Sequence, residues 1–282
     1  MPEGEQRGQQ HLERVIIVLV TPRDPTNVGG VVRVMGNFGL GHLRLVEPAA
    51  FDAGRALAVA HRGAAVIQAM TRHPSLADAL SDCGLAVATS ARVREVRHAK
   101  FAPWQTAGAL LEAARGAPAA LVFGPEDNGL SNEDLALCHA VSVIPTAPAD
   151  WSLNLAQATL VHAYELWLAA YGQRPSGDGP HDVARPPGRK ALLAQALRDG
   201  AEEGPPLALG AHREAMFGAL ESMLWAMHPN DNPGRVTAAL GRLRALLLRG
   251  APRTEEARLL TAIFQHVAHA LGRQPPGDPP DL

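Results

Sequence analysis

The stretch Val15–Val20 (VIIVLV) is an uninterrupted apolar run in which all but one residue are β-branched. Such a run indicates a buried strand. A turn through Pro22, Asp24 and Pro25 follows, and Asn27 is then predicted to cap a helix. Similar segments alternate along the chain, with strands over residues 42–46, 84–89, 119–123 and 141–144 and helices over residues 74–82, 106–115, 132–139 and 152–171. Strands separated by helices predict an α/β fold, in which a parallel sheet carries helices on both faces.

The composition of the chain changes after Tyr171. Residues 172–208 are rich in proline and glycine, which is typical of a linker. Three helical stretches follow over residues 209–227, 233–248 and 254–271, and strong turn chemistry (HPNDNP) separates the first two. The predicted organisation is a disordered N-terminus (1–13), an α/β domain (14–171), a linker (172–208), a small α-helical C-terminal domain (209–272) and a disordered tail (273–282).

Composition excludes several classes of protein. The 282 residues are 46% hydrophobic and 19% charged, which is a globular composition. The apolar runs are too short to cross a bilayer, and the polar N-terminus lacks the apolar segment of a secretion signal. Cys83 and Cys138 are the only cysteines, so neither a disulfide framework nor a cysteine-rich zinc site is expected. We therefore expect a cytoplasmic protein without a membrane partner, and its net charge of −2 argues against a wholly basic nucleic-acid coating.

The first polar motif, NVGGVVR over residues 27–33, lies shortly after the first strand. Its two glycines allow a tight turn and leave backbone amides facing whatever lies at the helix start. Arg33 falls between one and two turns into the helix, on the same side as Asn37. A capped helix with an exposed arginine would also explain this spacing. The motif is neither G-x-G-x-x-G nor a Walker loop, so it supports neither an NAD site nor an ATP site.

The second motif, LVFGPEDNGL over residues 121–130, follows the strand that ends at Phe123. Gly124 permits the close approach of a ligand to the carboxyl end of that strand, which is where ligands lie in open α/β sheets. Glu126 stands next to a turn, where binding backbone amides explains it at least as well as catalysis does.

The third motif is Ile144-Pro-Thr, followed by SLNLAQA over residues 152–158. Ser152 is an N-cap candidate for the long helix, and Asn154 falls in the first helical turn. Capping alone would explain Ser152. Neither a neighbouring His–Asp pair nor a G-x-S-x-G elbow supports a hydrolase nucleophile at this position.

Together the three motifs resemble the SPOUT superfamily of RNA 2′-O-methyltransferases, in its TrmH-like branch. The residues that match this family in order and spacing, within about residues 14–170, are Asn27, Arg33, Gly124, Glu126, Gly129, Leu130, Ser152, Leu153 and Asn154. Pro125 departs from the family, which often carries an arginine there, so one RNA contact is missing. The second and third motifs and the helical C-terminal appendage look closest to the subgroup that methylates nucleotide 32 of the tRNA anticodon loop.

The resemblance implies a homodimer in which the C-terminal part of the α/β domain forms a deep trefoil knot. It also implies S-adenosylmethionine (SAM) as the cofactor, held in the knot mainly by backbone groups, and it implies no metal. The cofactor-binding residues that it implies are Thr89, Ser90, Ala91, Gly124, Ile144, Trp151, Ser152 and Leu153. Arg33 is implied to be catalytic on the site of the partner subunit, Ser152 to bind the ribose hydroxyl, and Asn154 to hold the knot loop.

Contact with RNA is assigned to Asn27 and to two basic clusters. The first cluster follows the Thr89 loop directly and consists of Arg92, Arg94, Arg97 and Lys100. The second cluster consists of Arg235, Arg242, Arg244, Arg249 and Arg253. Three of them, Arg235, Arg242 and Arg249, recur every seven residues and hence share one helix face. A solvated helix face is the usual explanation of such a stripe. If these arginines instead bind phosphates, the binding will weaken with salt.

The sequence therefore predicts a SAM-dependent tRNA 2′-O-methyltransferase. One alternative is a methyltransferase for another tRNA position or for ribosomal RNA, because the catalytic residues do not encode the target. A second alternative, from another class, is an RNA-binding protein that has lost catalysis. The joint presence of Asn27, Arg33, Ser152 and Asn154 speaks against that loss.

Overall fold

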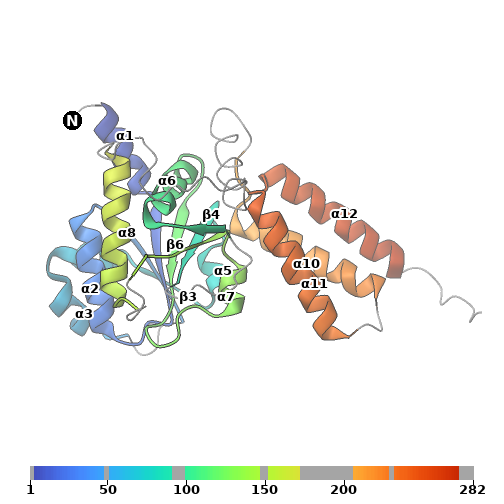
Figure 1. The fold of residues 1–282 in the computed structure, drawn as a ribbon, viewed down its shortest axis with the longest axis horizontal. Coiled ribbons are helices and arrows are strands. Elements are labelled where there is room, and N and C mark those ends of the chain that lie inside the picture. Colours follow the sequence, from blue (N-terminus) through green and yellow to red (C-terminus); the bar gives the residue numbers. More distant parts are fainter. Residues whose placement is uncertain are drawn as a thin grey trace, which may run out of the picture.

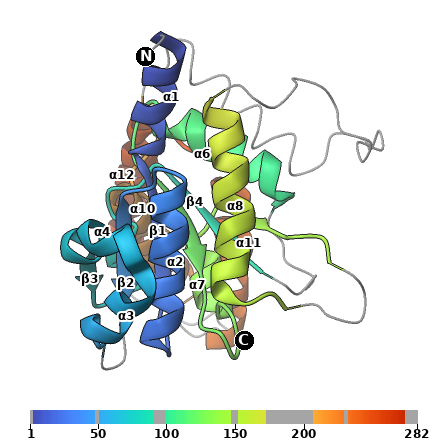
Figure 2. The same ribbon diagram turned by 90° about the vertical axis from the view of Figure 1, so that its left-hand side faces the viewer.

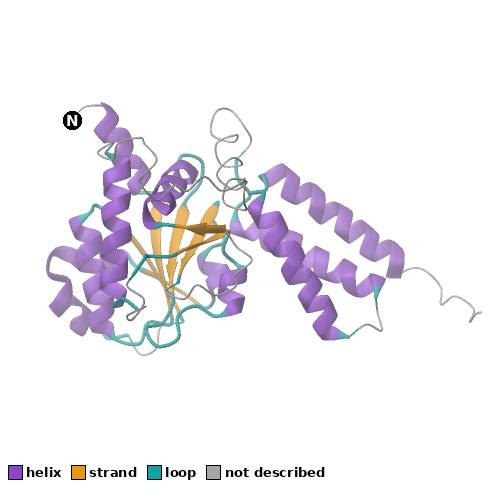
Figure 3. Cartoon of the chain, viewed as in Figure 1, coloured by secondary structure: helices purple, strands orange, loops and turns teal. Residues whose placement is uncertain are grey.

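The computed structural model describes residues 3–47, 51–90, 99–146, 152–171, 206–228 and 232–272. These residues form an α/β domain and, beside it, a group of three long helices (Figure 1). Figure 3 shows the strands gathered in one sheet, with helices on both of its sides.

The sheet contains seven parallel strands among the described residues, in the order β3-β2-β1-β6-β4-β7-β5. The strands are β1 Val15–Val20, β2 His42–Val46, β3 Thr71–His73, β4 Leu85–Thr89, β5 Ala99–Phe101, β6 Ala119–Phe123 and β7 Ala140–Ser142. The predicted parallel α/β sheet is confirmed. The sequence did not predict the edge strands β3 and β5, because each is only three residues long; β3 is mostly exposed, and β5 has one exposed residue, Lys100, between two buried ones.

The helices of the α/β domain connect these strands and cover the sheet. They are α1 Glu3–Leu12, α2 Pro25–Asn37, α3 Ala53–Ala60, the 3₁₀ helix η1 His61–Gly63, α4 Ala64–Ala69, α5 Leu76–Ala79, α6 Pro103–Ala114, α7 Asn132–Ala136 and α8 Leu155–Ala170. The helices predicted over residues 74–82 and 132–139 are shortened to α5 and α7, because the chain turns there to enter the next strand.

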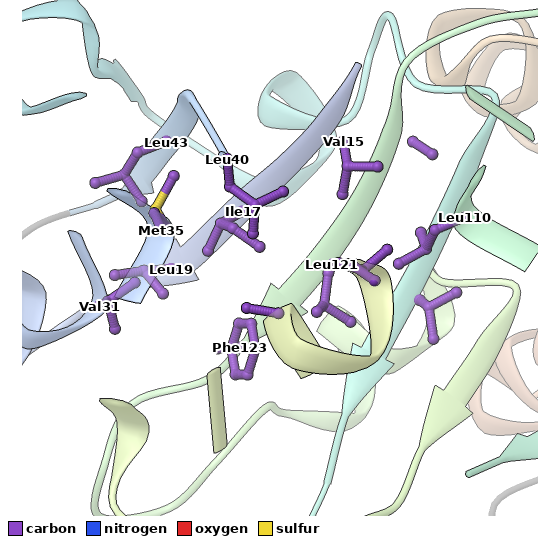
Figure 4. Packing of buried hydrophobic residues seen from close by; sticks show 14 of the residues in the cluster. Val15, Ile17, Leu19, Val31, Met35, Leu40, Leu43, Leu110, Leu121 and Phe123 are labelled. Carbon is purple, nitrogen blue, oxygen red and sulfur yellow. The ribbon is translucent and has the colours of Figure 1, made fainter. Parts of the chain in front are cut away.

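Two apolar layers hold the domain together, one on each face of the sheet. Alternate residues of β1 serve both layers, because successive side chains of a strand point to opposite faces. Val15, Ile17 and Leu19 pack under α2, α6 and α8, with Leu121 of β6 beside them (Figure 4). The other three β1 residues pack on the face that carries α5 and α7. Figure 2 shows α2 and α8 side by side over the first face.

Two helix starts differ from the sequence analysis. The N-cap of α2 is Asp24, whose carboxylate accepts a hydrogen bond from the Thr26 amide at 2.9 Å, and not Asn27. Pro25 fixes this start, because proline suits the first helical position. The N-cap of α8 is Asn154, and not Ser152. The side chain of Asn27 is therefore available for other contacts, and Ser152 belongs to the loop before α8.

The N-terminus forms a helix where disorder was predicted over residues 1–13. Helix α1 packs on α8 through Gly8 and Leu12, which lie on one helix face. Leu12 is buried. A Cβ at Gly8 would lie 2.9 Å from the carbonyl carbon of Ala170, so only glycine allows this approach. One apolar side chain and one glycine in a polar segment were too weak a signal to predict the helix.

The C-terminal helices are α10 Gly210–Met227, α11 Pro233–Arg249 and α12 Thr254–Gly272, and they confirm the predicted helical C-terminal unit. They share a small core around Met216, Phe217 and Leu220 of α10. Leu207, at the end of the predicted linker, pairs with Arg253 in an antiparallel bridge, so this residue belongs to the unit as well.

A buried arginine joins the helical unit to the α/β domain. Arg213 of α10 donates hydrogen bonds to the carbonyl oxygens of Cys83 and Gly84, at 3.1 Å each, and to that of Ala208. Burial lowers the pKa of Arg213 to about 10, so the side chain stays charged at neutral pH. Arg244 of α11 donates to the last carbonyl of α7 at 2.9 Å. The two units therefore meet in a specific polar contact.

Candidate active site

The carboxyl ends of β4, β6 and β7 and the start of α8 surround a cavity of about 700 Å³. This is the edge at which parallel α/β sheets bind their ligands. The sequence-predicted residues that the structure brings together around the cavity are Asn27, Thr89, Ser90, Gly124, Ile144, Ser152, Leu153 and Asn154. Residues more than 120 positions apart in the sequence thus meet at one place, because their strands end side by side.

The loop after β6 forms one wall of the cavity and depends on Gly124. A Cβ at this position would lie 2.5 Å from the carbonyl carbon of Gly129 and 2.9 Å from its Cα, so the loop folds back directly on Gly124. Gly129 itself has φ +67°, a conformation that suits glycine. The sequence predicts that Gly124 leaves space for a ligand, but in the structure Gly124 is first needed for the packing of its own loop.

Replacing Gly124 with alanine should lower the free energy of unfolding by about 1–3 kcal/mol, because the added methyl group overlaps backbone atoms that cannot rotate away. Urea unfolding measures the change. The matched control is Gly108→Ala in α6, where an added Cβ meets no atom within 4 Å and alanine favours the helix. Equal stability of Gly124→Ala and wild type would contradict the packing assigned to this loop.

Three side chains tie the walls of the cavity together. Glu126 accepts a hydrogen bond from the Asn27 side-chain amide at 2.8 Å and another from the Arg23 backbone amide at 3.1 Å. Asn154 donates to the side-chain oxygen of Asn27 at 3.2 Å. Glu126 therefore binds a backbone amide, as one interpretation of the sequence had it. Both ends of the Asn27 amide are engaged inside the protein, and its assignment to RNA stays a prediction.

Asn154 also stabilises the start of α8. Its side-chain oxygen accepts from the Ala156 amide at 2.9 Å, while Gln157 accepts from the Asn154 amide at 3.1 Å. This reciprocal capping satisfies amides that the helix leaves unpaired. Ser152 is exposed in the preceding loop at the cavity wall. The two residues therefore play different parts, a cap and an accessible hydroxyl.

Arg33 does not line the cavity. It lies on the exposed side of α2, six residues beyond Asn27, which is about 9 Å along the helix axis. It makes no hydrogen bond or ion pair with any residue that the structure describes, so its guanidinium is open to a group from outside the chain. Arg33 thus lies outside the cavity that the other predicted catalytic residues, Ser152 and Asn154, line.

A buried polar chain at the cavity was missed by the sequence analysis. Thr106 of α6 donates to the hydroxyl of Ser142 at 2.8 Å, and the Ser142 hydroxyl lies 2.8 Å from Nε2 of His162. Nδ1 of His162 lies 2.8 Å from the Ala158 carbonyl oxygen, which can only accept. Nδ1 therefore carries the proton, and Nε2 accepts from Ser142. The one available signal was the position of His162 on the apolar stripe of α8, with Leu155 and Leu166.

His162 should make stability depend on pH. Burial lowers the pKa of its imidazole from 6.5 to about 4. Between these values the unfolded chain binds a proton that the folded chain does not, so stability is full above pH 6.5 and falls as the pH drops toward 4. The total loss is about 3 kcal/mol at 1.36 kcal/mol per unit of pKa. Unfolding curves of wild type and His162→Gln measure it, and parallel pH profiles of the two proteins would contradict a neutral buried His162.

Of the basic residues predicted to contact RNA, some lie within the described ranges and others do not. Lys100 is exposed on β5, and Arg235 and Arg242 are exposed on α11. Arg249 is half-buried and donates to the Ala245 carbonyl at 3.1 Å. Predicted site residues that lie outside the described residues are Ala91, Arg92, Arg94, Arg97 and Trp151. The predicted knot also stays a prediction, because residues 147–151, between β7 and α8, lie outside the described ranges.

Comparison with known proteins places this site in a family. The sequence model of the SpoU rRNA Methylase family matches residues 14–164, more than half of the chain. The chain belongs to the SpoU rRNA methylase family. The region matched covers the α/β domain and every residue that lines the cavity, so the SpoU methylase match and the cavity describe the same part of the chain.

Relatives of this SpoU methylase include proteins named TrmJ, which confirms the resemblance found in the motifs. The tRNA (cytidine/uridine-2′-O-)-methyltransferase TrmJ of Cronobacter sakazakii (strain ATCC BAA-894) is 32% identical over 270 residues, 94% of this chain and 100% of the relative. The tRNA (cytidine/uridine/adenosine-2′-O-)-methyltransferase TrmJ of Pseudomonas aeruginosa (strain UCBPP-PA14) is 41% identical over 167 residues, 57% of this chain and 65% of the relative.

The crystal structure of TrmJ from Z. mobilis ZM4 has a TM-score of 0.72 at 30% identity, and the match covers 89% of this chain and 98% of that chain. The similarity to this structure therefore includes the helical C-terminal unit as well as the SpoU methylase domain. Within the ranges that the structure describes, no cluster of three or more His, Cys, Asp or Glu is placed to hold a metal ion. No helix among the described residues has the length and apolar character needed to span a membrane.

Proposed function

We propose that this SpoU methylase transfers a methyl group from SAM to the ribose 2′-hydroxyl of nucleotide 32 in the anticodon loop of tRNA, in the cytoplasm. The observation that carries the proposal is the cavity at the carboxyl ends of β4, β6 and β7, lined by all three motifs. Similarity to a TrmJ over 94% of this chain supports tRNA as the substrate class.

The residues of the cavity fit a nucleoside cofactor. Its volume of about 700 Å³ is within the range of small-molecule sites. Thr89, Ser90 and Ile144 lie at strand ends, where the sheet leaves backbone groups for a ligand, while Phe123 and Leu130 supply apolar walls. When bound, SAM supplies a methyl group on a positively charged sulfur. The trefoil knot, with Ala91, Trp151 and Leu153 as further cofactor contacts, belongs to this proposal.

The chain's own residues orient the ribose and stabilise the charge that develops on it. Ser152, exposed at the cavity wall, binds the ribose hydroxyl. Asn154 holds the loop through its contact with Asn27. Arg33 stabilises the developing alkoxide or fixes the adjacent phosphate. It does not act as the base, because a guanidinium only donates hydrogen bonds and offers no acceptor for the proton.

We propose that Arg33 reaches the cavity of a second copy of the chain, so that the enzyme is a homodimer. The support is that Arg33 lies outside its own cavity on the exposed side of α2. The neighbouring helix α8 carries an apolar outer face, with Leu160 44% and Tyr164 50% exposed. Phe38, directly after α2, extends this face, with its ring centroid 6.2 Å from that of Tyr164.

RNA would contact the basic residues outside the cavity. Arg235 and Arg242 line a groove of about 420 Å³ between α10 and α11, with an apolar floor that includes Leu224 and Val236. Lys100, exposed on β5, belongs to the proposed surface, and so do Arg249 and the cluster Arg92, Arg94 and Arg97. Phosphate contacts of this kind position the RNA and carry no sequence information.

Ribosomal RNA is the second candidate substrate, because the matching family is described as rRNA methylases. The test is transfer of tritium from labelled SAM to purified tRNA and to ribosomal RNA in parallel. Ribose-methylation mapping of RNA from a deletion strain then locates the nucleotide. We expect tritium to be transferred to tRNA, and we expect tRNA from the deletion strain to lack the methyl group at nucleotide 32. Labelling of ribosomal RNA alone would show that ribosomal RNA, and not tRNA, is the substrate. RNA binding that does not depend on SAM, without methyl transfer, would show a protein that has lost catalysis.

A further inference from the structure

Ser142 is the residue at which three strands end together. It pairs with Thr89, the last residue of β4, and with Phe101, the last residue of β5. Its carbonyl oxygen accepts a hydrogen bond from the Ser90 amide at 3.0 Å. The backbone of Ser142 therefore holds Ser90, the residue directly after β4, and the chain beyond Ser142 leads to Ile144, which lines the same cavity.

The side chain of Ser142 connects this point to two helices. Its hydroxyl stands between Thr106 of α6 and His162 of α8, at 2.8 Å from each. All three side chains are at most 1% exposed. Every donor in this row of hydrogen bonds has an acceptor, from Thr106 through Ser142 to His162 and on to the Ala158 carbonyl of α8. Hydrogen bonds in such a dry environment are directional, and losing one partner is costly.

This chain of hydrogen bonds fixes the position of α8 along its own axis, which apolar packing alone does not determine. The remaining buried contacts of α8 with the sheet are made largely by Leu155, Ala163 and Leu166, which bury the helix without fixing its position along its axis. The hydrogen bond from Ser142 to His162 does fix that position. His162 lies eight residues after Asn154, about 12 Å along the helix, so it also sets where the cap and the loop of Ser152 stand.

We propose that His162 is a positioning residue, which through Ser142 holds the start of α8 and the residues just after β4 and β7, Ser90 and Ile144, in the arrangement that binds the cofactor. This inference rests on the proposed function for the identity of the cofactor, SAM. His162 itself lines the cavity, where its ring meets Phe123 edge to face at 5.8 Å between centroids. Both ring nitrogens are engaged within the protein, so its effect on SAM passes through the elements that it aligns.

The test compares His162→Leu, which removes the acceptor for Ser142, with His162→Gln, whose side-chain oxygen can take the place of Nε2. Calorimetry with SAM should show a dissociation constant raised about tenfold or more in the leucine variant and largely restored in the glutamine variant. The affinity for tRNA should change far less than that for SAM in both, because the proposed phosphate contacts of Arg235 and Arg242 lie on the helical unit, outside the cavity. SAM binding by His162→Leu within twofold of wild type would overturn the proposal.

Thr159→Val is the matched control. It deletes a buried hydroxyl on the same helix whose hydrogen bond, to Leu155 at 2.8 Å, stays within α8. SAM affinity should change little in this variant, even if the stability falls. In a double-mutant cycle, Ser142→Ala should add little to His162→Leu, because both break one chain. Additive effects, or an equal loss of affinity in Thr159→Val, would contradict a positioning role.

Hydrogen exchange of the cofactor-free protein separates this inference from the proposed function. The Ser90 amide, bonded to the Ser142 carbonyl, should exchange faster in His162→Leu and not in Thr159→Val. If wild type bound no SAM, the proposed cofactor would be wrong, while faster exchange at Ser90 would still support the positioning. Unchanged exchange at Ser90 in His162→Leu would overturn it, whatever the cofactor.

Discussion

Replacing Arg33 with alanine should lower the turnover number of methyl transfer by about 10²–10³-fold, the usual cost of losing one group that stabilises a developing negative charge. The dissociation constant of SAM should stay within twofold of wild type, because Arg33 does not line the cavity. Single-turnover transfer of tritium from SAM to tRNA measures the first quantity, and calorimetry measures the second. Turnover within twofold of wild type would remove Arg33 from the chemistry.

Arg115→Ala is the matched control for this variant, since it removes the same charge. Arg115 lies shortly before β6, at the opposite edge of the sheet from the cavity, in an exposed pair with Glu112. Such pairs contribute little, so both turnover and stability should stay close to wild type.

Mixing subunits tests whether Arg33 acts across a dimer. Arg33→Ala and Gly124→Val should each be inactive. The first lacks the arginine, and in the second the side chain of valine keeps the loop after β6 from folding back on residue 124. A mixed dimer has one cavity that is intact and faces an intact Arg33 of the other subunit, so mixing should restore part of the activity. No restoration in dimers shown to have exchanged would place Arg33 on its own cavity.

The central strands of the fold could be predicted from the sequence because burial on both faces leaves a pattern that can be read locally. Val15–Val20 and the residues of β6 are continuous apolar runs, and both strands lie where such runs belong, in the middle of the sheet. The edge strand β3 (TRH) has no such pattern, because its side chains are largely exposed to solvent and so need not be apolar. The register of β3 against β2 decides that it is a strand at all.

The cavity walls could be predicted for a related reason. Gly124 and Ile144 each follow a strand closely, so knowing the strands places these residues at one edge. His162 could not be found in this way. Its neighbours in the sequence show an apolar helix face, and only the approach of Ser142 turns a buried histidine into part of a polar chain. The packing role of Gly124 could not be predicted from the sequence either, because the backbone that it contacts, at Gly129, comes from a later turn of its own loop.

The groove of Arg235 and Arg242 sets a second large effect, on binding of tRNA. Arg235→Gln/Arg242→Gln should weaken the affinity for tRNA about a hundredfold at low salt, since a hydrogen bond to a charged group contributes about 1.5–3 kcal/mol. If each arginine neutralises one phosphate, the slope of log K against log salt should also become shallower by about 1.4–1.8. Turnover at saturating tRNA and the affinity for SAM should not change, because the groove lies on the helical unit, away from the cavity.

Substitutions in the full-length chain test this more sharply than removal of the helices. Deleting them would strip the buried Arg213 from the Cys83 and Gly84 carbonyls and so disturb the α/β domain itself. The matched control is Arg115→Gln/Arg258→Gln, which removes the same charge from exposed positions outside the groove. Filter binding to tRNA between 50 and 200 mM salt gives both slopes. A slope that falls equally in the two double variants would show a diffuse effect of net charge, and an unchanged slope in Arg235→Gln/Arg242→Gln would mean that tRNA does not use this groove.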